Sequence, residues 1–189
     1  LVKKINELFP VMEIQKLPTG VKPQKYIRIE KPTISPQIIV DWEKKGPLRW
    51  AKGNLPGADT QLRKERTHPT GGLRLTYAGW KIDGKKIDHT AYFREDLFKG
   101  YEWVEERALP KVEVARIPFR IRILGEDKGE YRLKVRHKPS GEAGQRNYTT
   151  LLSWGVLSKH IEKSNLKGKD LKLYAPPEGK KEPFYIEIG

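Results

Sequence analysis

Residues 139–150, PSGEAGQRNYTT, hold side chains whose chemistry suits the edges of nucleic-acid bases. Arginine pairs in a bidentate manner with guanine, and asparagine and glutamine pair with adenine, in the major groove of duplex DNA. The segment has no apolar periodicity, and its two glycines favour a loop. We expect this C-terminal arm to read bases; an ordinary polar surface loop is the alternative. Its base-reading candidates are Gln145, Arg146, Asn147, Tyr148 and Thr149.

A second segment of this kind, the N-terminal arm, covers residues 52–72, KGNLPGADTQLRKERTHPTGG. It is the longest stretch without apolar rhythm, and a loop of this length inside a compact domain is usually functional or disordered. Basic side chains lie among its glycines and prolines, so we predict a second reading arm, with a merely mobile loop as the alternative. Its base-reading candidates are Arg63, Arg66 and His68.

The catalytic patterns of nucleases are not found in the sequence. The Asp…Glu-x-Lys pattern of metal-dependent enzymes is missing, because Glu130 and Lys134 are wrongly spaced. His137 has no second histidine or aspartate beside it, as a His-Asn-His site would need. No His-x-Lys pair, phosphate-binding glycine-rich loop or zinc-ligand cluster occurs. We therefore predict no catalytic residue, no metal and no cofactor; a small self-contained nuclease is the alternative.

The two arms need a scaffold, and its strongest element is a predicted hairpin. Apolar and basic residues alternate over 116–123 and again over 131–138, on either side of a Gly/Asp turn at 125–129. Such alternation indicates a β-hairpin with one apolar face. The other face is almost wholly cationic, so it gains most from an anionic partner or from acidic residues elsewhere. The phosphate-binding candidates on it are Arg120, Arg122, Arg132, Lys134, Arg136 and Lys138.

Many further short strands with turn signals predict a mainly β (α+β) fold, a closed or nearly closed barrel. Trp42 and Trp50 are expected to seal the edge of its core. The strands are predicted at 25–30, 37–42, 73–77, 80–87, 89–94, 170–174 and 184–188, and short helices at 1–9 and 156–163.

The chain is strongly basic, with a formal net charge of +14 and a pI of about 9.8. Residues 1–110 hold 21 basic and 14 acidic side chains, and residues 111–189 hold 17 and 10. This even spread favours a broad polyanion-binding surface over a basic tail. Absence of cysteine excludes disulfides and thiolate sites. No signal peptide or membrane-length apolar run is found, so we expect a cytoplasmic protein with no membrane contact, and its Lys/Glu/Arg enrichment favours a thermophilic source.

The residues from the C-terminal arm onward resemble the B3-type DNA-binding domains of restriction endonucleases. The effector domain of the type IIE enzymes is the most similar, and C-terminal domains of phospholipase-D-type enzymes are alike. In the effector class an Arg-Asn pair precedes a Trp-Gly by a short strand, and a Gly-led strand follows. Here Arg146-Asn147, Trp154-Gly155 and residues 168–174 fill those places, and Thr70-Gly71-Gly72 falls near the family's N-terminal arm. The resemblance covers residues 55–175.

This resemblance implies a B3-like seven-stranded open pseudobarrel that grips the major groove with two arms. It assigns residues 55–189 to that pseudobarrel and leaves residues 1–54 as an N-terminal extension of a helix and strands packed on it. The implied function is sequence-specific binding of double-stranded DNA, as the recognition or effector domain of a restriction endonuclease. The nuclease domain is expected elsewhere in a parent protein.

Two other binding functions remain open at this point. In a modified-base (methylated DNA) reader, an aromatic pocket would hold a flipped base, and Trp80, Tyr92 and Trp103 are the candidates for it. An RNA-binding barrel is the second, because charge and aromatic content do not distinguish RNA from duplex DNA.

Overall fold

A computed structural model describes residues 42–62, 68–76, 80–82, 84–141 and 149–189, which lie in one compact unit, Val40–Gly189. The helix predicted at 1–9 and the strand predicted at 25–30 lie outside the described residues. The elements are η1 (Trp42–Lys44), β1 (Leu48–Lys52), β2 (Gly72–Leu75), β3 (Lys81–Ile82), β4 (Lys85–Lys86), η2 (Tyr92–Leu97), β5 (Val104–Arg107), β6 (Val112–Ile123), β7 (Glu126–His137), β8 (Thr150–Ser153), η3 (Gly155–Leu157), α2 (Ser158–Lys163), β9 (Leu171–Tyr174) and β10 (Phe184–Ile188).

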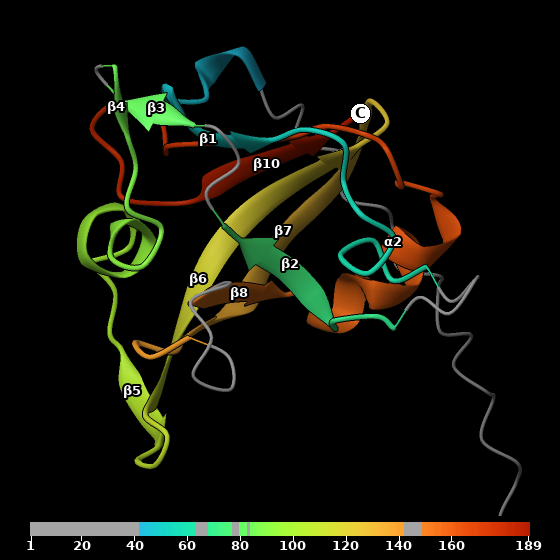
Figure 1. Ribbon diagram of the computed structural model, residues 1–189. Helices are drawn as coiled ribbons and strands as arrows, with labels where there is room; N and C mark the ends of the chain where they lie inside the picture. The colour runs from blue at the N-terminus through green and yellow to red at the C-terminus, as the bar shows by residue number, and fades with distance from the viewer. Residues whose placement is uncertain (1–41, 63–67, 77–79, 83, 142–148) are drawn as a thin grey trace, which may run out of the picture. The chain divides into compact units, whose positions relative to one another are not determined.

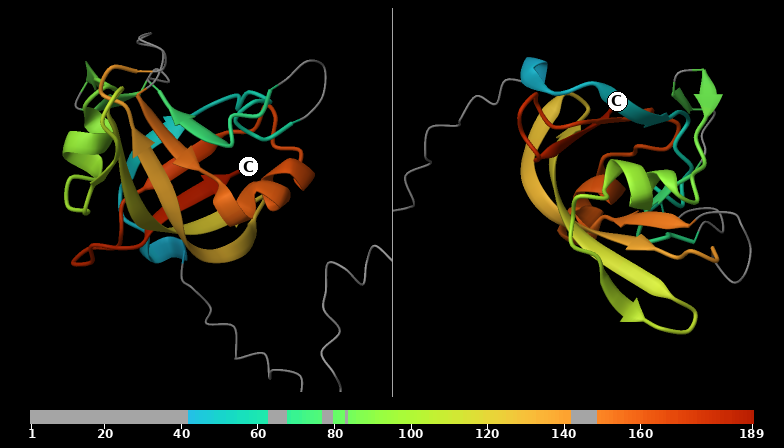
Figure 2. Two further views of the ribbon diagram at one scale, coloured as in Figure 1. Left: turned by 90° about the horizontal axis from the view of Figure 1, so that it is seen from below. Right: turned by 90° about the vertical axis from the view of Figure 1, so that its left-hand side faces the viewer.

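Seven strands form one curled, open sheet in the order β1-β9-β10-β6-β7-β8-β2, and β5 pairs with β6 as an eighth strand (Figure 1). All pairings are antiparallel except that of β10 with β6, which is parallel. The two views in Figure 2 show the sheet bending around its interior, with β1 and β2 as its edges. The prediction of a mainly β, open, barrel-like sheet with short helices is confirmed at this level.

The β6–β7 hairpin forms the centre of the sheet and follows the predicted alternation. Ile117 and Ile121 of β6 are fully buried, as is Val135 of β7. The turn is tighter than predicted, because β7 already begins at Glu126 and only Leu124 and Gly125 connect the strands. Their φ angles of +50° and +82° are those that a two-residue hairpin turn requires.

Aromatic side chains fill the interior of the curled sheet. Phe98 contacts Phe119 of β6 and Phe184 of β10 edge-on, with ring centroids 6.0 and 5.1 Å apart. Trp50 of β1 meets Phe93 of η2 in the same manner at 5.4 Å. These large rings come from elements far apart in sequence, so their packing fixes the curvature of the sheet.

One sequence-based prediction needs correction. Residues 89–94, predicted as a strand, instead lead into the helical turn η2. Asp88 accepts hydrogen bonds from the backbone and hydroxyl of Thr90, which starts the turn, and η2 buries both Tyr92 and Phe93. Trp42, predicted at the core edge, is buried there and packs edge-on against Tyr185 at a ring-centroid distance of 5.1 Å.

The part of the assigned N-terminal extension that the structure describes contributes to the sheet itself. Within it, β1 pairs with β9 from Leu48 to Lys52. Among the described residues, no helix is both long enough and apolar enough to cross a membrane.

Candidate nucleic-acid interface

Both predicted arms connect to the β2–β8 strand pair, one at each end. The N-terminal arm leads into β2, where Gly72 pairs with Ser153, and the C-terminal arm leads into β8, where Thr150 pairs with Leu75. Three residue steps along β2 separate these two points by about 10 Å. The loops chosen from the sequence therefore attach to the same edge of the sheet (Figure 2).

Two of the base-reading candidates lie in the described part of the chain. His68 is exposed. Thr149 is only 1% exposed, and its hydroxyl donates a 2.9 Å hydrogen bond to the carbonyl of His89. Thr149 therefore anchors the end of the C-terminal arm to the turn before η2. The other candidates lie outside the described residues: Arg63, Arg66, Gln145, Arg146, Asn147 and Tyr148.

A buried carboxylate fixes the start of the N-terminal arm between the two sheet edges. Asp59 is 0% exposed and accepts from Lys52 Nζ of β1 at 2.7 Å and from Arg74 Nε of β2 at 2.6 Å. Lys52 also donates to the backbone carbonyl of Arg74 at 2.9 Å. Because β1 and β2 do not pair with each other, these polar bonds join the edges that the backbone leaves open.

The Thr-Gly-Gly sequence ends the N-terminal arm for a steric reason. Gly71 has a φ of +74°, which favours glycine, and a Cβ on Gly72 would lie 2.2 Å from the carbonyl oxygen of Leu152. The backbone N–H of Trp154 donates to Gly71, and its indole donates to the carbonyl of Asp59 at 2.7 Å. Trp154 of the Trp-Gly pair thus holds the end of this arm, at Gly71, and the arm residue Asp59.

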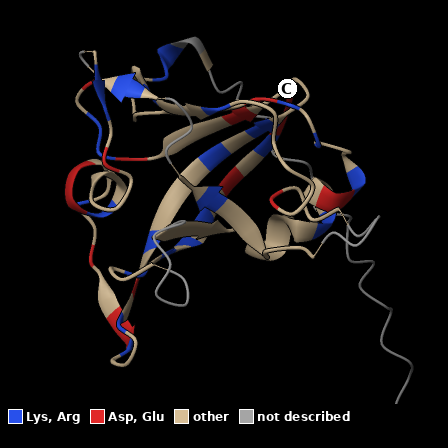
Figure 3. Cartoon of the chain, viewed as in Figure 1, with Lys and Arg blue, Asp and Glu red and all other residues tan. Residues whose placement is uncertain are grey.

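The cationic face of the hairpin is largely matched by carboxylates. Five of the six phosphate-binding candidates form ion pairs with described residues, and Lys138, at the start of the C-terminal arm, also has a partner. The pairs are Arg120 with Asp127, Arg122 with Glu187 at 3.5 Å, Arg132 with Glu182 at 3.4 Å, Lys134 with Glu106, and Arg136 with Glu106 at 3.4 Å. Four carboxylates therefore offset much of the charge of these five cations, which is the second outcome considered from the sequence. Figure 3 marks where acidic and basic residues lie along the strands.

Asp127 lies on β7 within the hairpin, and the other three carboxylates come from other strands or from a connecting segment. Glu106 lies on β5, and the hydrogen bond from Lys134 is the main cause that lowers its pKa below the usual value. Glu187 lies on β10, opposite Arg122 in the parallel β10–β6 register. Exposed ion pairs of this kind contribute about 0–1 kcal/mol each, so a phosphate group can displace a carboxylate, with a smaller gain than at an unpaired cation.

Lysines without an ion pair to the described residues gather instead in residues 159–169, here called the basic segment. It includes four exposed lysines, Lys159, Lys163, Lys167 and Lys169, and one glutamate. None of the four forms an ion pair with the described residues. The sequence does not single out this segment, because its lysines follow neither strand alternation nor the composition of the two arms.

Backbone hydrogen bonds place the end of the basic segment beside the start of the N-terminal arm. Leu55 donates to the carbonyl of Lys169 at 2.8 Å, and Gly168 donates to the carbonyl of Leu55 at 2.9 Å. α2 precedes this contact on the same side of the molecule (Figures 1 and 3). The unpaired positive charge therefore adjoins one of the two predicted arms.

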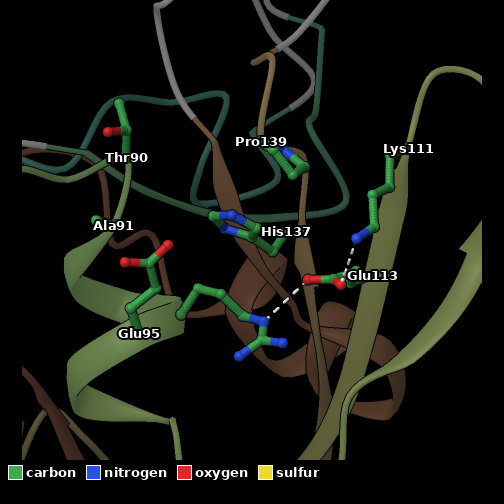
Figure 4. Close-up of a pocket in the computed structure, with 8 residues that line it drawn as sticks. Thr90, Ala91, Glu95, Lys111, Glu113, His137 and Pro139 are labelled. Atoms are coloured by element: carbon green, nitrogen blue, oxygen red, sulfur yellow. Dashed lines mark hydrogen bonds and ion pairs between the residues drawn. The ribbon is translucent and has the colours of Figure 1, made fainter.

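A pocket of about 450 Å³ opens at the end of β7, where the C-terminal arm begins. Figure 4 shows His137 at its centre, between Glu95 of η2 and Glu113 of β6. The imidazole Nδ1 lies 3.0 Å from the hydroxyl oxygen of Thr150. Burial is the main cause that lowers the pKa of His137 to about 4, so the imidazole is neutral at pH 7.

One carboxylate organises the charged wall of this pocket. Glu113 accepts from Arg94 Nε at 2.9 Å and lies 3.0 Å from Lys111 Nζ (Figure 4). The hydrogen bond from Lys111 is the main cause that lowers the pKa of Glu113. The guanidinium carbon of Arg94 also lies 4.7 Å from the ring centroid of Trp103, which restricts its orientation.

The three aromatic residues considered for a base pocket do not line this one. Tyr92 is buried, and its hydroxyl donates to the carbonyl of Arg49 at 2.9 Å. The indole of Trp103 donates to the carbonyl of Phe98 at 3.1 Å, and Trp80 packs against the core. Tyr92 and Trp103 therefore support the fold and the pocket wall.

Within the described ranges, no group of three or more His, Cys, Asp or Glu side chains is arranged to hold a metal ion. No protein-family model, curated protein or solved structure matches the chain.

Proposed function

We propose that the chain is a sequence-specific duplex-DNA-binding domain, the recognition or effector part of a restriction system. The observation that carries this proposal is the basic segment, whose four lysines lack ion pairs with the described residues and adjoin the start of the N-terminal arm. Cations free of carboxylate partners release counterions from DNA without first losing an internal contact. The net charge of +14 supports the same partner.

The finer fold assignment, a B3-like pseudobarrel, belongs to this proposal. It is supported by the curled sheet of seven successive strands and by the attachment of both arms to the β2–β8 pair. In this proposal the arms read bases, and lysines beside them contact phosphates and set the register.

The experiment that tests the proposal measures the salt dependence of duplex binding. If about six phosphates are neutralised, log K falls with log[salt] at a slope of about −5. Replacing both Lys167 and Lys169 by alanine should make that slope shallower by about 2, at about 0.9 per lost contact. The backbone hydrogen bonds that Gly168 and Lys169 form with Leu55 do not depend on the lysine side chains, so the fold is retained.

The matched control replaces Lys180 and Lys181, two exposed lysines without an ion pair to the described residues, in the turn before β10. This variant has the same net charge as the first and should keep the wild-type slope within about half a unit. Equal changes for both variants would mean that only overall charge attracts DNA. A wild-type slope near zero would refute DNA binding through phosphate contacts altogether.

A further inference from the structure

The charged side chains that line the pocket at the end of β7 have no net charge, and this restricts which ligands can bind there. Two cations, Arg94 and Lys111, and two carboxylates, Glu95 and Glu113, line it. The fifth titratable group, His137, is neutral at pH 7 because burial lowers its pKa to about 4. The formal charges cancel, so neither a phosphate group nor a metal cation gains a net attraction from the lining.

Hydrogen-bonding groups of both kinds face this neutral space. Glu95 is exposed and forms no ion pair with the described residues, so its carboxylate can accept from a ligand. Arg94 uses its Nε on Glu113, which leaves the terminal nitrogens of its guanidinium as donors. The Nε2 of His137 has no hydrogen bond to the described residues, since only Nδ1 meets Thr150.

The groups are also held in place before any ligand arrives. Trp103 packs on the Arg94 guanidinium at 4.7 Å and meets the His137 ring edge-on, at a centroid distance of 6.2 Å. Thr150 fixes the imidazole from the other side. A planar ligand can therefore lie against the imidazole or the guanidinium without a cost for ordering these side chains.

We infer that this pocket binds an unpaired nucleobase that carries an exocyclic amino group, such as cytosine or adenine. The amino group donates to Glu95, while ring nitrogen or carbonyl acceptors of the base receive hydrogen bonds from Arg94. Carboxylates accept from the amino group of cytosine in DNA-binding proteins in the same way. The volume of about 450 Å³ admits a base with its sugar.

The site deepens the proposed function and rests on it, because an unpaired base reaches the pocket when the duplex lies near the C-terminal arm. Pro139 of that arm forms part of the pocket wall. A base extruded from the stack is read through its polar edge in such pockets. Affinity for a free nucleoside is expected to be weak, because the phosphate contacts of DNA are then missing.

The test titrates the whole chain with cytidine, adenosine, thymidine and inorganic phosphate, followed by NMR signals of the His137 ring and of the Arg94 side chain. Cytidine and adenosine should cause saturable shifts, and thymidine, which lacks the amino group, should bind at least about tenfold more weakly. Glu95→Gln should weaken cytidine binding about tenfold, whereas Glu178→Gln, which changes an exposed carboxylate that does not line the pocket, should leave it unchanged.

Three results would overturn the inference: no saturable shift with any nucleoside, phosphate binding at least as strong as cytidine binding, or equal binding of thymidine. Because Glu95 is exposed, its substitution should not unfold the chain, and the amide spectrum checks this directly. The salt-dependent binding of ordinary duplex DNA does not need the pocket. Failure of the inference therefore leaves the salt slope intact, whereas failure of the proposed function removes that slope.

Discussion

Asp59→Asn should destabilise the protein more than any exposed charge substitution. The change keeps the shape of the side chain and removes its charge, leaving Lys52 and Arg74 without their shared carboxylate. Removing one partner from a fully buried ion pair costs about 3–5 kcal/mol. The Arg74 side chain is 31% exposed and can turn partly to water, so we expect a loss of about 3 kcal/mol in the free energy of unfolding.

The assay is urea denaturation of the whole chain followed by tryptophan fluorescence, which Trp154 reports on directly because its indole donates to the Asp59 carbonyl. Asp127→Asn is the matched control. It removes a carboxylate that pairs with Arg120 on the outer face and is 30% exposed, so it should cost about 1 kcal/mol or less. An equal m-value for both variants would show that the denatured states are comparable.

A double-mutant cycle separates the ion pair from other effects of the substitution. Lys52→Met leaves Asp59 with Arg74 alone. The double variant with Asp59→Asn should lose at least about 1 kcal/mol less of the free energy of unfolding than the two single variants lose in sum. If Asp59→Asn lowers the free energy of unfolding no more than Asp127→Asn does, the ion pairs of Asp59 with β1 and β2 do not contribute to stability. The closure of the sheet edges would then depend on apolar packing alone.

Two further predictions concern the hairpin and the pocket. Leu124→Asn should raise the free energy of unfolding by up to about 1 kcal/mol, because leucine at φ +50° is strained and asparagine is favoured there. A lower free energy of unfolding in urea denaturation would contradict this prediction. The pKa of His137 is lowered from 6.5 to about 4 in the folded state, so its contribution to stability is fully present above pH 6.5 and falls as the pH drops from 6.5 towards 4. Urea denaturation at pH 7, 5.5 and 4.5 should show that the free energy of unfolding declines by on the order of 2–3 kcal/mol from the highest to the lowest pH. This decline should be absent in His137→Asn. If the free energy of unfolding changed equally with pH in both proteins, other titratable groups would cause the decline.

The hairpin was predictable from the sequence because strand alternation is a local property. Burial alternates along residues 116–123, except at buried Pro118, and along residues 131–137, because successive side chains of a strand point to opposite faces whatever the rest of the chain does. The prediction of β6 and β7 as core strands followed from that pattern, and the arms before β2 and β8 were predicted where the pattern is missing. The basic composition by itself likewise indicates a polyanionic partner, because net charge does not depend on how the chain folds.

The partners of charged residues were decided only by the tertiary structure. Glu187 reaches Arg122 because β10 runs parallel to β6 in one particular register, and Glu106 reaches Lys134 because β5 returns along β6. No local period encodes such meetings, so the hairpin face looked more cationic in sequence than it is in space. The burial of Asp59 between two unpaired sheet edges arises in the same way.

The pocket around His137 shows the same division between local and tertiary information. Alternation predicted that His137 lies on the apolar face of its strand, and it is 3% exposed. Of the groups around it, Arg94 of η2 comes from a segment predicted as a strand, and Glu113 lies at the start of β6, before the predicted hairpin. A helical turn replaced the predicted strand there because burial of Phe93 and Phe98 in a shared aromatic core outweighed the weak strand propensity of six residues.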